Sequence, residues 1–429
     1  MLRFIHQQAL RWLDIWWIPG GIRRMRAATH RPGSAETVRQ SSRERHLLLD
    51  VSIIAVSDAG TGIQRVVRSI TLNLLKTPPA GMTVKLVHAT RKRPYRYANH
   101  YTAKLMGREP TADDTIVDVE PGDIFLGLDL TNRPLPLRQP QLRQWRQRGV
   151  RCAFVVYDLL PIMYPAWFTP IAGKAFHRWL ETLAIHADAL FCISQSVAND
   201  VEHWFGTHYQ LSPSDVSIDW FHLGADIPLA ADVVSARNRS IDVVIGSRSG
   251  PVILMVGTVE PRKGHARILD AFEKIWSDGD DATLVIAGRA GWRVEALLAR
   301  LAALHDKQAN LVWLNSASDD DLCTLYAGAD GVIMASEAEG FGLPLVEAAQ
   351  WGIPIFANDL AVFREVAGDH ATYFRADSGD ELATQLQSWL DRLRAGEATK
   401  SGAMPRLTWE QSAAKLSVML ERLARHSGI

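Results

Sequence analysis

The stretch GVIMASEAEGFGLPLVEAAQWGIPIFAN (residues 331–358) holds two apolar runs separated by a glycine turn and a helical segment. The runs GVIMAS (331–336) and IPIFAN (353–358) have the length and branched composition of buried strands. Two consecutive strands joined through a helix indicate parallel pairing with a crossover connection. This stretch therefore predicts an α/β fold built on a parallel sheet.

The same alternation extends on both sides of this stretch. Further strands of the second half are predicted at PVILMVG (251–257), ATLVIAG (282–288), NLVWL (310–314) and ATYF (371–374). In the first half, LLLDVSIIAV (47–56) is predicted as a strand, and helical periodicity follows from Ile63 to Leu75. More strands are predicted at 84–87, 124–126, 152–156 and 189–193. Strands that alternate with helices in this way indicate doubly wound α/β domains.

The chain has 429 residues, which is too long for one hydrophobic core. We therefore predict two Rossmann-like domains that face each other across a cleft, the default ligand site in such a plan. The first would span 47–245, and the second 246–405. Residues 1–46 would form an amphipathic segment and linker. Residues 406–429 would form a C-terminal helix that crosses back to the first domain.

Charge is unevenly distributed along a chain whose formal net charge is zero. Residues 1–150 contain 24 Lys and Arg but 12 Asp and Glu. This basic N-terminal part of the chain suits contact with anionic lipid headgroups or with a phosphorylated acceptor. A solvated surface of uneven charge would give the same count. No nucleic-acid partner is predicted.

The N-terminus MLRFIHQQALRWLDIWWIPGG (1–21) places apolar residues at helical spacing, and Arg23, Arg24 and Arg26 follow it. It is too short and too charged to cross a bilayer, so we predict an interfacial helix that brings residues 1–26 to a membrane surface. The alternative is a helix packed on the protein itself. Because Cys152, Cys192 and Cys323 form no CxxC pair, a reducing compartment is expected. The location predicted is cytoplasmic, on the inner face of the membrane.

The turn DAGTGIQR (58–65) follows a predicted strand and opens a helix. Glycines let a backbone approach a ligand, and a helix N-terminus favours anions. Arg65 stands where a dinucleotide fingerprint needs a third glycine, so no NAD site is predicted. Gly62 is a candidate for phosphate contact, and an ordinary strand-to-helix turn is the alternative.

Two adjacent cations, Arg262 and Lys263, follow a predicted buried strand in GTVEPRKGH (257–265). Arginine binds a phosphate through a bidentate fork and lysine as a point charge, so this pair suits a diphosphate. A solvated basic turn is the alternative, but the end of a parallel strand favours a binding site.

Glu339 and Glu347 lie eight residues apart around the turn Gly340–Phe341–Gly342. The backbone amides of this turn would meet a phosphate at a helix N-terminus. Carboxylates accept hydrogen bonds from vicinal hydroxyls, so Glu339 suits a sugar and Glu347 a ribose. The alternative is that the helix dipole alone favours glutamate near a helix start.

The segments EAEGFGLPLVEA (337–348) and VGTVEPRKGH (256–265) resemble the paired-glutamate and donor-phosphate motifs of retaining glycosyltransferase family 4, which has the GT-B fold. This resemblance covers about 250–390. DAGTGIQRVVR (58–68) and VVYDLLPI (155–162) resemble a subgroup of bacterial mannosyl- and rhamnosyltransferases that assemble surface polysaccharides such as O-antigen. LTWEQSA (407–413) is also similar to this family.

The resemblance implies a role for each candidate residue. Arg262 and Lys263 would neutralise the departing diphosphate, Glu339 would contact the transferred sugar, and Glu347 would contact the ribose. The backbone of Phe341, Gly342 and Leu343 would hold phosphate and sugar, while Gly62 would approach the diphosphate from the other domain.

Asp158 is predicted as a catalytic group on the acceptor or sugar side, with a turn-capping aspartate as the alternative. Many family members carry a histidine where this chain has Tyr157, so a histidine contact to the donor is in doubt here.

The family implies transfer with retention, in which the leaving phosphate takes the acceptor proton and the protein supplies positioning and charge. The donor would be a nucleotide diphosphate sugar, with GDP-mannose favoured, and the acceptor a lipid-linked saccharide or polysaccharide. No cofactor or metal is expected. Asp319, Asp320 and Asp321 are predicted to cap a helix rather than bind a metal.

Two other functions are compatible with the same motifs. One is a nucleotide-sugar epimerase of the same fold, and the other is a non-catalytic partner in a polysaccharide assembly complex.

Overall fold

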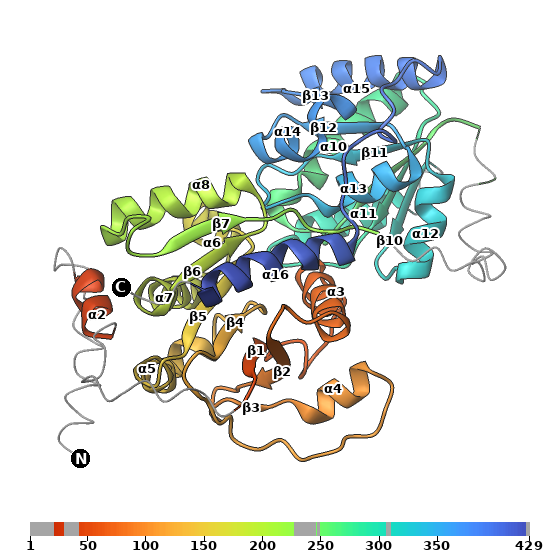
Figure 1. The fold of residues 1–429 in the computed structure, drawn as a ribbon. Helices are drawn as coiled ribbons and strands as arrows, with labels where there is room; N and C mark the ends of the chain where they lie inside the picture. Colours follow the sequence, from red (N-terminus) through yellow and green to blue (C-terminus); the bar gives the residue numbers. More distant parts are fainter. Residues whose placement is uncertain (1–20, 30–42, 227–245, 247–248, 306–309, 426–429) are drawn as a thin grey trace. The chain divides into compact units, whose positions relative to one another are not determined.

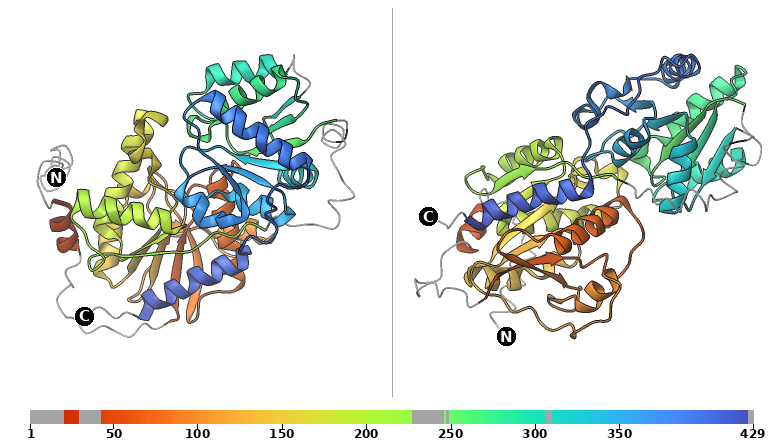
Figure 2. Two further views of the ribbon diagram at one scale, coloured as in Figure 1. Left: turned by 90° about the horizontal axis from the view of Figure 1, so that it is seen from above. Right: turned by 45° about the vertical axis from the view of Figure 1, so that its right-hand side comes forward.

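The computed structural model describes residues 21–29, 43–226, 246, 249–305 and 310–425. The chain divides into two compact units. The first comprises the described parts of Met1–Ile162, Pro170–Phe221 and Ala413–Ile429, and the second comprises those of Met163–Thr169 and His222–Ser412. Figures 1 and 2 show helices on both faces of each central sheet. Each unit is described separately below.

The first unit is built on a seven-stranded sheet in the order β3-β2-β1-β4-β5-β6-β7, in which only β3 is antiparallel to its neighbour. Its strands are β1 (Arg45–Asp50), β2 (Met82–His88), β3 (Arg96–Tyr97), β4 (Ile124–Gly127), β5 (Arg151–Val156), β6 (Ala189–Cys192) and β7 (Ser217–Trp220). Its helices are α2 (Gly21–Thr29), α3 (Gly62–Lys76), α4 (Asn99–Leu105), α5 (Gln139–Gln147), α6 (Leu160–Met163), α7 (Pro170–His186) and α8 (Gln195–Trp204). Met163, the last residue of α6, falls in the second unit. Residues of α16 (Trp409–Arg425) from Ala413 onward also belong to this unit.

The second unit contains a six-stranded parallel sheet in the order β10-β9-β8-β11-β12-β13. Its strands are β8 (Val252–Val256), β9 (Thr283–Ala287), β10 (Leu311–Leu314), β11 (Gly331–Met334), β12 (Ile355–Asn358) and β13 (Thr372–Phe374). Its helices are α10 (His265–Ser277), α11 (Glu295–His305), α12 (Asp319–Gly328), α13 (Leu343–Trp351), α14 (Ala361–Ala367) and α15 (Gly379–Arg394). All six strands fall where the sequence predicts them.

Helix α10 shows how the apolar pattern builds this core. Its buried residues recur every three or four positions and include Ile268, Leu269, Phe272, Ile275 and Trp276. The face they form packs beside α15, whose Trp389 stacks on Phe356 of β12 with ring centroids 5.1 Å apart. Each such buried side chain stabilises the fold by about 1.5–3 kcal/mol.

The first strand is shorter than the sequence predicts. The run 47–56 was expected to be one strand, but β1 ends at Asp50 and the following residues form turns. The Asp50 carboxylate accepts the amide of Ser52 at 3.0 Å, and the Asp129 carboxylate accepts the amides of Ile53 and Ile54 at 2.8 Å each. Because these amides bond to side chains, they cannot continue the sheet, and the prediction of a ten-residue strand is wrong.

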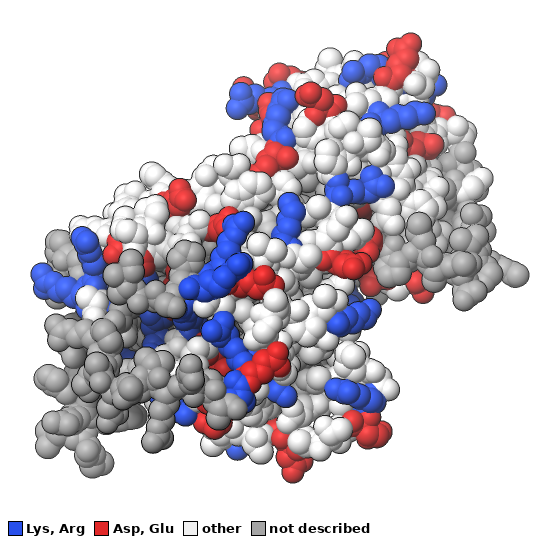
Figure 3. Space-filling model, viewed as in Figure 1, with Lys and Arg blue, Asp and Glu red and all other residues white. Residues whose placement is uncertain are grey.

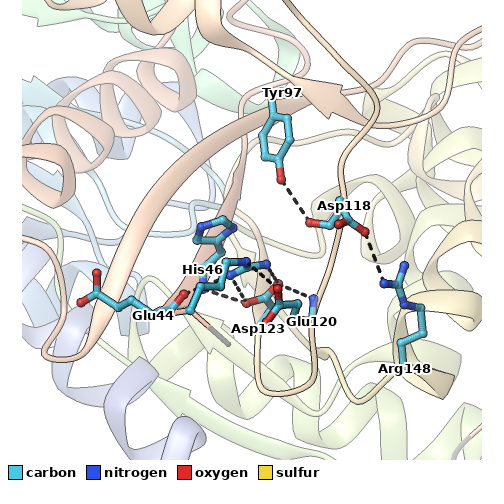
Figure 4. A network of polar contacts seen from close by, with 8 residues as sticks. Glu44, His46, Tyr97, Asp118, Glu120, Asp123 and Arg148 are labelled. Atoms are coloured by element: carbon cyan, nitrogen blue, oxygen red, sulfur yellow. Dashed lines mark hydrogen bonds and ion pairs between the residues drawn. The ribbon is translucent and has the colours of Figure 1, made fainter. Parts of the chain in front are cut away.

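At the other end of β1, the buried Asp123 holds the strand starts together (Figure 4). Its carboxylate accepts the guanidinium of Arg43 at 3.0 and 2.7 Å, the amide of His46 at 2.8 Å and the amide of Glu120 at 2.9 Å. Nearby, the Tyr97 hydroxyl donates to the Asp118 carbonyl at 3.1 Å. This network fixes the starts of β1 and β4.

The position of helix α2 contradicts part of the prediction that residues 1–26 contact a membrane. Arg26 is buried and donates to the carbonyl of Ala184 in α7 at 3.1 Å, and burial lowers its pKa to about 10. Its guanidinium therefore packs inside the protein rather than facing lipid headgroups, while Arg23 and Arg24 are exposed. The apolar residues of the predicted interfacial helix, 1–20, lie outside the described residues.

Basic and acidic side chains are interspersed on the face shown in Figure 3. Several basic residues of the first unit are paired, as in the contact of Arg146 with Asp188 at 2.7 Å. Within the described parts of the chain, no helix combines the length and apolar character needed to cross a bilayer.

Candidate functional site

The strand order of the second unit places the two predicted donor motifs side by side. The chain winds outward from β8 in one direction through β9 and β10, and in the other through β11, β12 and β13. The winding therefore reverses between β8 and β11, which pair directly. Open α/β sheets bind ligands at the carboxyl end of such a switch point. The segment with Arg262 follows β8, and the segment with Glu339 follows β11, so both motifs lie there.

The turn after β8 carries the two cations on a short 3-10 helix, Pro261–Lys263. Gly264 ends it with a left-handed φ of 74°. A Cβ at this position would lie 2.2 Å from the carbonyl oxygen of Ala335, which follows β11. Glycine at 264 thus lets the two segments approach closely, and the Glu337 amide donates to the Arg262 carbonyl at 2.7 Å.

Glu339 joins both cations directly. Its carboxylate accepts from the Arg262 guanidinium at 2.8 Å, from the Lys263 ammonium, and from the Ser336 hydroxyl at 2.8 Å. Burial alone would raise the pKa of Glu339, but the charges of Arg262 and Lys263 outweigh it and lower the pKa to about 2. Glu339 is therefore a carboxylate at neutral pH, held between two cations.

Glu260 is a member of this network that sequence reasoning missed. It is buried, and its carboxylate lies 2.7 Å from the second guanidinium nitrogen of Arg262. Arg262 thus bridges two carboxylates, a geometry that fixes the plane of its guanidinium. The only sequence signal was a glutamate just before Pro261 in a turn between two apolar segments.

The turn before α13 has the geometry expected for an anion site. Gly342 is the N-cap with a φ of 95°, and no side chain caps the helix. A Cβ on Gly342 would meet the Phe363 ring at 2.8 Å. Phe341 is buried and packs edge-on against His222, with ring centroids 5.5 Å apart. The backbone from Phe341 to Leu343 is therefore held in place without a side chain blocking the helix end.

Glu347 is buried on α13, as the sequence places it, and its carboxylate accepts the Tyr326 hydroxyl at 2.6 Å. Tyr326 lies on α12 and was not identified from the sequence. No local pattern links it to Glu347, because the two residues are 21 positions apart and meet only through helix packing.

Gly62 begins α3 in the first unit, and a capping box holds the preceding turn. The Gln64 side chain accepts the amide of Ala59 at 2.8 Å and donates to the Ser57 carbonyl at 2.6 Å. Thr61 and Gln64 thus stabilise the turn before α3, which is the structural role given above as the alternative for this motif. Gly62 itself is exposed, and its contact with a phosphate stays a prediction.

A buried carboxylate cluster lies at the switch point of the first sheet, between β1 and β4. The Asp50 carboxylate accepts the Ser52 hydroxyl at 2.5 Å and the Tyr95 hydroxyl at 2.7 Å. Burial raises the pKa of Asp50 to about 7, and Asp129 adds to this effect. The only sequence signal for this cluster is an aspartate at the end of an apolar run.

Asp158 and Tyr157 follow β5, at the same sheet edge. The Asp158 carboxylate accepts the amide of Leu160 at 3.1 Å, the capping bond of the alternative interpretation, and its catalytic role stays a prediction. The Tyr157 hydroxyl is buried and donates to the Leu128 carbonyl at 2.8 Å, and burial raises its pKa well above 10. The Tyr157 side chain is therefore part of the buried core of the first unit.

The aspartates at 319–321 form the first turn of helix α12, and Asp321 takes part in its cap, in line with the predicted capping role. Ser318 is the N-cap of α12 and forms a capping box with Asp321, whose amide donates to the Ser318 hydroxyl at 3.1 Å. Over the described ranges, no group of three His, Cys, Asp or Glu side chains is arranged to hold a metal ion.

Solved structures with two such units share this fold. Anabaena HepE in complex with UDP-glucose matches with a TM-score of 0.56 at 15% identity, covering 89% of this chain and 98% of that chain. The sucrose-phosphate synthase of Thermosynechococcus elongatus matches with a TM-score of 0.60 at 15% identity, covering 89% and 100%. The predicted GT-B fold is confirmed by these matches.

Several sequence relatives are mannosyltransferases by name. The chain is 39% identical over 390 residues to the serotype-specific mannosyltransferase WbdA of Escherichia coli, covering 89% of this chain and 48% of WbdA. This chain thus spans about half the length of the WbdA relatives. Its residues 241–400, which include the whole network around Glu339, match the family described as "Glycosyl transferases group 1". The match therefore lies within the part of the chain that forms the second unit.

Proposed function

We propose that this protein is a retaining glycosyltransferase that moves a mannose-like hexose from a nucleotide diphosphate sugar to a growing lipid-linked or polysaccharide acceptor. The observation that carries the proposal is the placement of Arg262, Lys263 and Glu339 at the switch point of the second sheet. Two cations beside a helix N-terminus suit a diphosphate, and a carboxylate between them suits sugar hydroxyls. The mannosyltransferase relatives favour mannose, with GDP-mannose as donor.

In this reaction, the bond from the anomeric carbon to the diphosphate breaks and a bond to an acceptor hydroxyl forms on the same face. The leaving phosphate takes the proton of that hydroxyl. Arg262 and Lys263 stabilise the charge that develops on the diphosphate, which is where preorganised cations contribute most. We propose that this chemistry proceeds without a metal or cofactor, because the two cations can carry the charge that a metal would otherwise neutralise.

A donor panel tests the proposal. Full-length protein is incubated with GDP-mannose, UDP-glucose and other nucleotide sugars, with and without a lipid-linked saccharide, and NMR reads the linkage of the product. Nucleotide release only with acceptor, and an α-linked product from an α-linked donor, is the expected result. A changed sugar without any acceptor would indicate an epimerase, and donor binding without turnover would indicate a non-catalytic partner.

Glu347→Ala is expected to weaken donor binding about tenfold or more, because hydrogen bonds to a charged group contribute about 1.5–3 kcal/mol. Calorimetry with the nucleotide diphosphate measures this loss. Tyr326→Phe is the matched control, since it removes the partner of Glu347 but leaves the carboxylate. Its affinity should fall less than that of Glu347→Ala. Donor affinity unchanged in Glu347→Ala would reject the ribose contact.

We further propose that the protein works at the inner face of the cytoplasmic membrane, with residues 1–20 as the contact. Deleting these residues should reduce flotation with anionic liposomes while leaving donor affinity unchanged. The deletion stops before α2, because Arg26 packs against α7 and its loss would disturb the first unit. Flotation in low and high salt separates apolar insertion from charge attraction. Equal flotation of the two proteins would exclude this contact.

A further inference from the structure

A cluster of partly exposed aromatic rings in the second unit lies outside the network around Glu339. It consists of Tyr164, Trp167, Phe168 and Trp292, called the aromatic platform below. Tyr164 is 38% exposed and Trp292 is 37% exposed, and Met163 beside them is 37% exposed. Contiguous apolar patches on a protein surface are typical of binding sites.

Two loops build the platform and hold it rigidly. Tyr164 and Trp167 stack with ring centroids 4.3 Å apart, and Phe168 contacts Trp292 at 5.7 Å. The Trp292 indole N–H donates to the Trp167 carbonyl at 2.7 Å, and the Arg293 guanidinium donates to the Phe168 carbonyl at 3.2 Å. The rings are therefore fixed before any ligand arrives, which lowers the entropy cost of binding.

The backbone under Trp292 is strained in a way that supports a binding role. Arg293 has a φ of 58°, in the left-handed region that non-glycine residues rarely adopt. Strained positions of this kind persist where the surrounding contacts fix them, and they gather at ligand sites. Here the strain turns the chain so that Trp292 and Arg293 both reach the 164–168 loop.

The platform is continuous with the segment that carries the donor-site cations. The Val259 amide donates to the Arg289 carbonyl at 2.8 Å, and the Gly291 amide donates to the Val259 carbonyl at 2.9 Å. Val259 is three residues before Arg262, so a chain span of at most about 11 Å separates them. A chain of a few sugar units could lie on the platform while its end reaches the site of transfer.

We propose that the aromatic platform binds saccharide units of the acceptor chain, an inference that rests on the proposed transfer to a glycan. A sugar ring presents an apolar C–H face and a rim of hydroxyls. The C–H face fits the electron-rich face of an aromatic ring, and the exposed guanidinium groups of Arg289 and Arg293 can donate to the hydroxyls. The patch is a few rings wide and edged by donors, which suits an oligosaccharide better than a broad apolar protein surface.

Binding is measured first without any reaction, by titrating the full-length protein with mannose and with linear mannohexaose. Wild-type protein should bind the hexamer, and Trp292→Ala should bind it about tenfold more weakly, the value of one aromatic stacking contact. Trp292→Phe should retain most of the affinity because it keeps a ring. Trp220→Ala is the matched control, because Trp220 is 36% exposed on β7 of the other unit.

Transfer kinetics give the second readout. Trp292→Ala should raise KM for a long acceptor about tenfold and leave kcat and KM for a single-sugar acceptor unchanged. Equal KM values for long and short acceptors in wild type and variant would overturn the platform but leave the proposed function intact. Hexamer binding that depends on Trp292 without transfer from any donor would support the platform and reject the function. If Trp292→Ala lost binding to phosphatidylglycerol vesicles but bound the hexamer as well as the wild type, the saccharide role of the platform would be overturned in favour of a lipid contact.

Discussion

Replacing both Arg262 and Lys263 with alanine is expected to lower kcat by about a thousandfold, with a much smaller effect on acceptor KM. In the proposed reaction the two cations meet one leaving group, and removing a preorganised group that stabilises transition-state charge costs about a hundredfold to a thousandfold. The double variant should therefore lose less than the product of the two single losses. Steady-state rates at saturating donor, with GDP-mannose as the leading donor, measure this.

The control for this pair is Lys274→Ala, which removes an exposed lysine on α10 that pairs with Asp380 at 2.5 Å. It changes the charge of the same unit without touching the switch point, so kcat should stay at the wild-type value. Melting temperatures of all variants separate unfolding from loss of chemistry. A double variant with the wild-type kcat would exclude the two cations from the reaction.

Glu339→Ala is expected to lower the free energy of unfolding by about 3–5 kcal/mol and to reduce kcat/KM at least a hundredfold. Removing one partner of a largely buried ion pair leaves its charged partners poorly compensated. Here two cations lose the same carboxylate, and Arg262 keeps its contact with Glu260. Glu339→Gln keeps the shape and should show a smaller loss of stability. Glu337→Gln is the matched control, because Glu337 is exposed two residues earlier.

Two further measurements test whether the charge of Glu339 matters, rather than its packing alone. The nucleotide diphosphate should raise the melting temperature of Glu339→Gln more than that of the wild type, because its phosphates replace the missing negative charge. In the wild type, the pKa of Glu339 is lowered to about 2. Its contribution to stability is therefore complete above the unfolded pKa of about 4.3 and is lost as the pH falls toward 2. Equal nucleotide shifts in both proteins would contradict the proposed exchange of charges.

The second sheet could be predicted strand by strand because its parallel strands are buried on both faces. Such strands appear in the sequence as continuous apolar runs. Strands β3 and β7 were missed for a physical reason. Strand β3 has two residues, and β7 has exposed positions at both ends, so neither forms an apolar run. The end of β1 was missed because it depends on Asp129, 79 positions from Asp50, which accepts the amides of Ile53 and Ile54.

The predicted site divides in the same way. Arg262, Lys263 and Glu339 could be found because each lies in the turn after a buried strand, and parallel strands bring such turns together. Glu260 and Tyr326 could not be found, because their roles arise from a guanidinium bridged by two carboxylates and from the packing of α12 beside α13. Tyr157 shows the reverse case, because this motif position holds a side chain whose hydroxyl donates to the Leu128 carbonyl of its own unit.

The return of α16 to the first unit has a consequence for synthesis on the ribosome. Leu416 and Leu420 are fully buried, and the Glu421 carboxylate accepts the Ala80 amide at 2.9 Å. These residues are translated only after the whole second unit, up to Ser412. The first unit therefore begins first in translation but is completed last. The apolar surface that α16 covers stays exposed until residues some 190 positions after Phe221 have been made. Nascent chains stalled before Ala413 should therefore hold a first unit that is more sensitive to protease than the second.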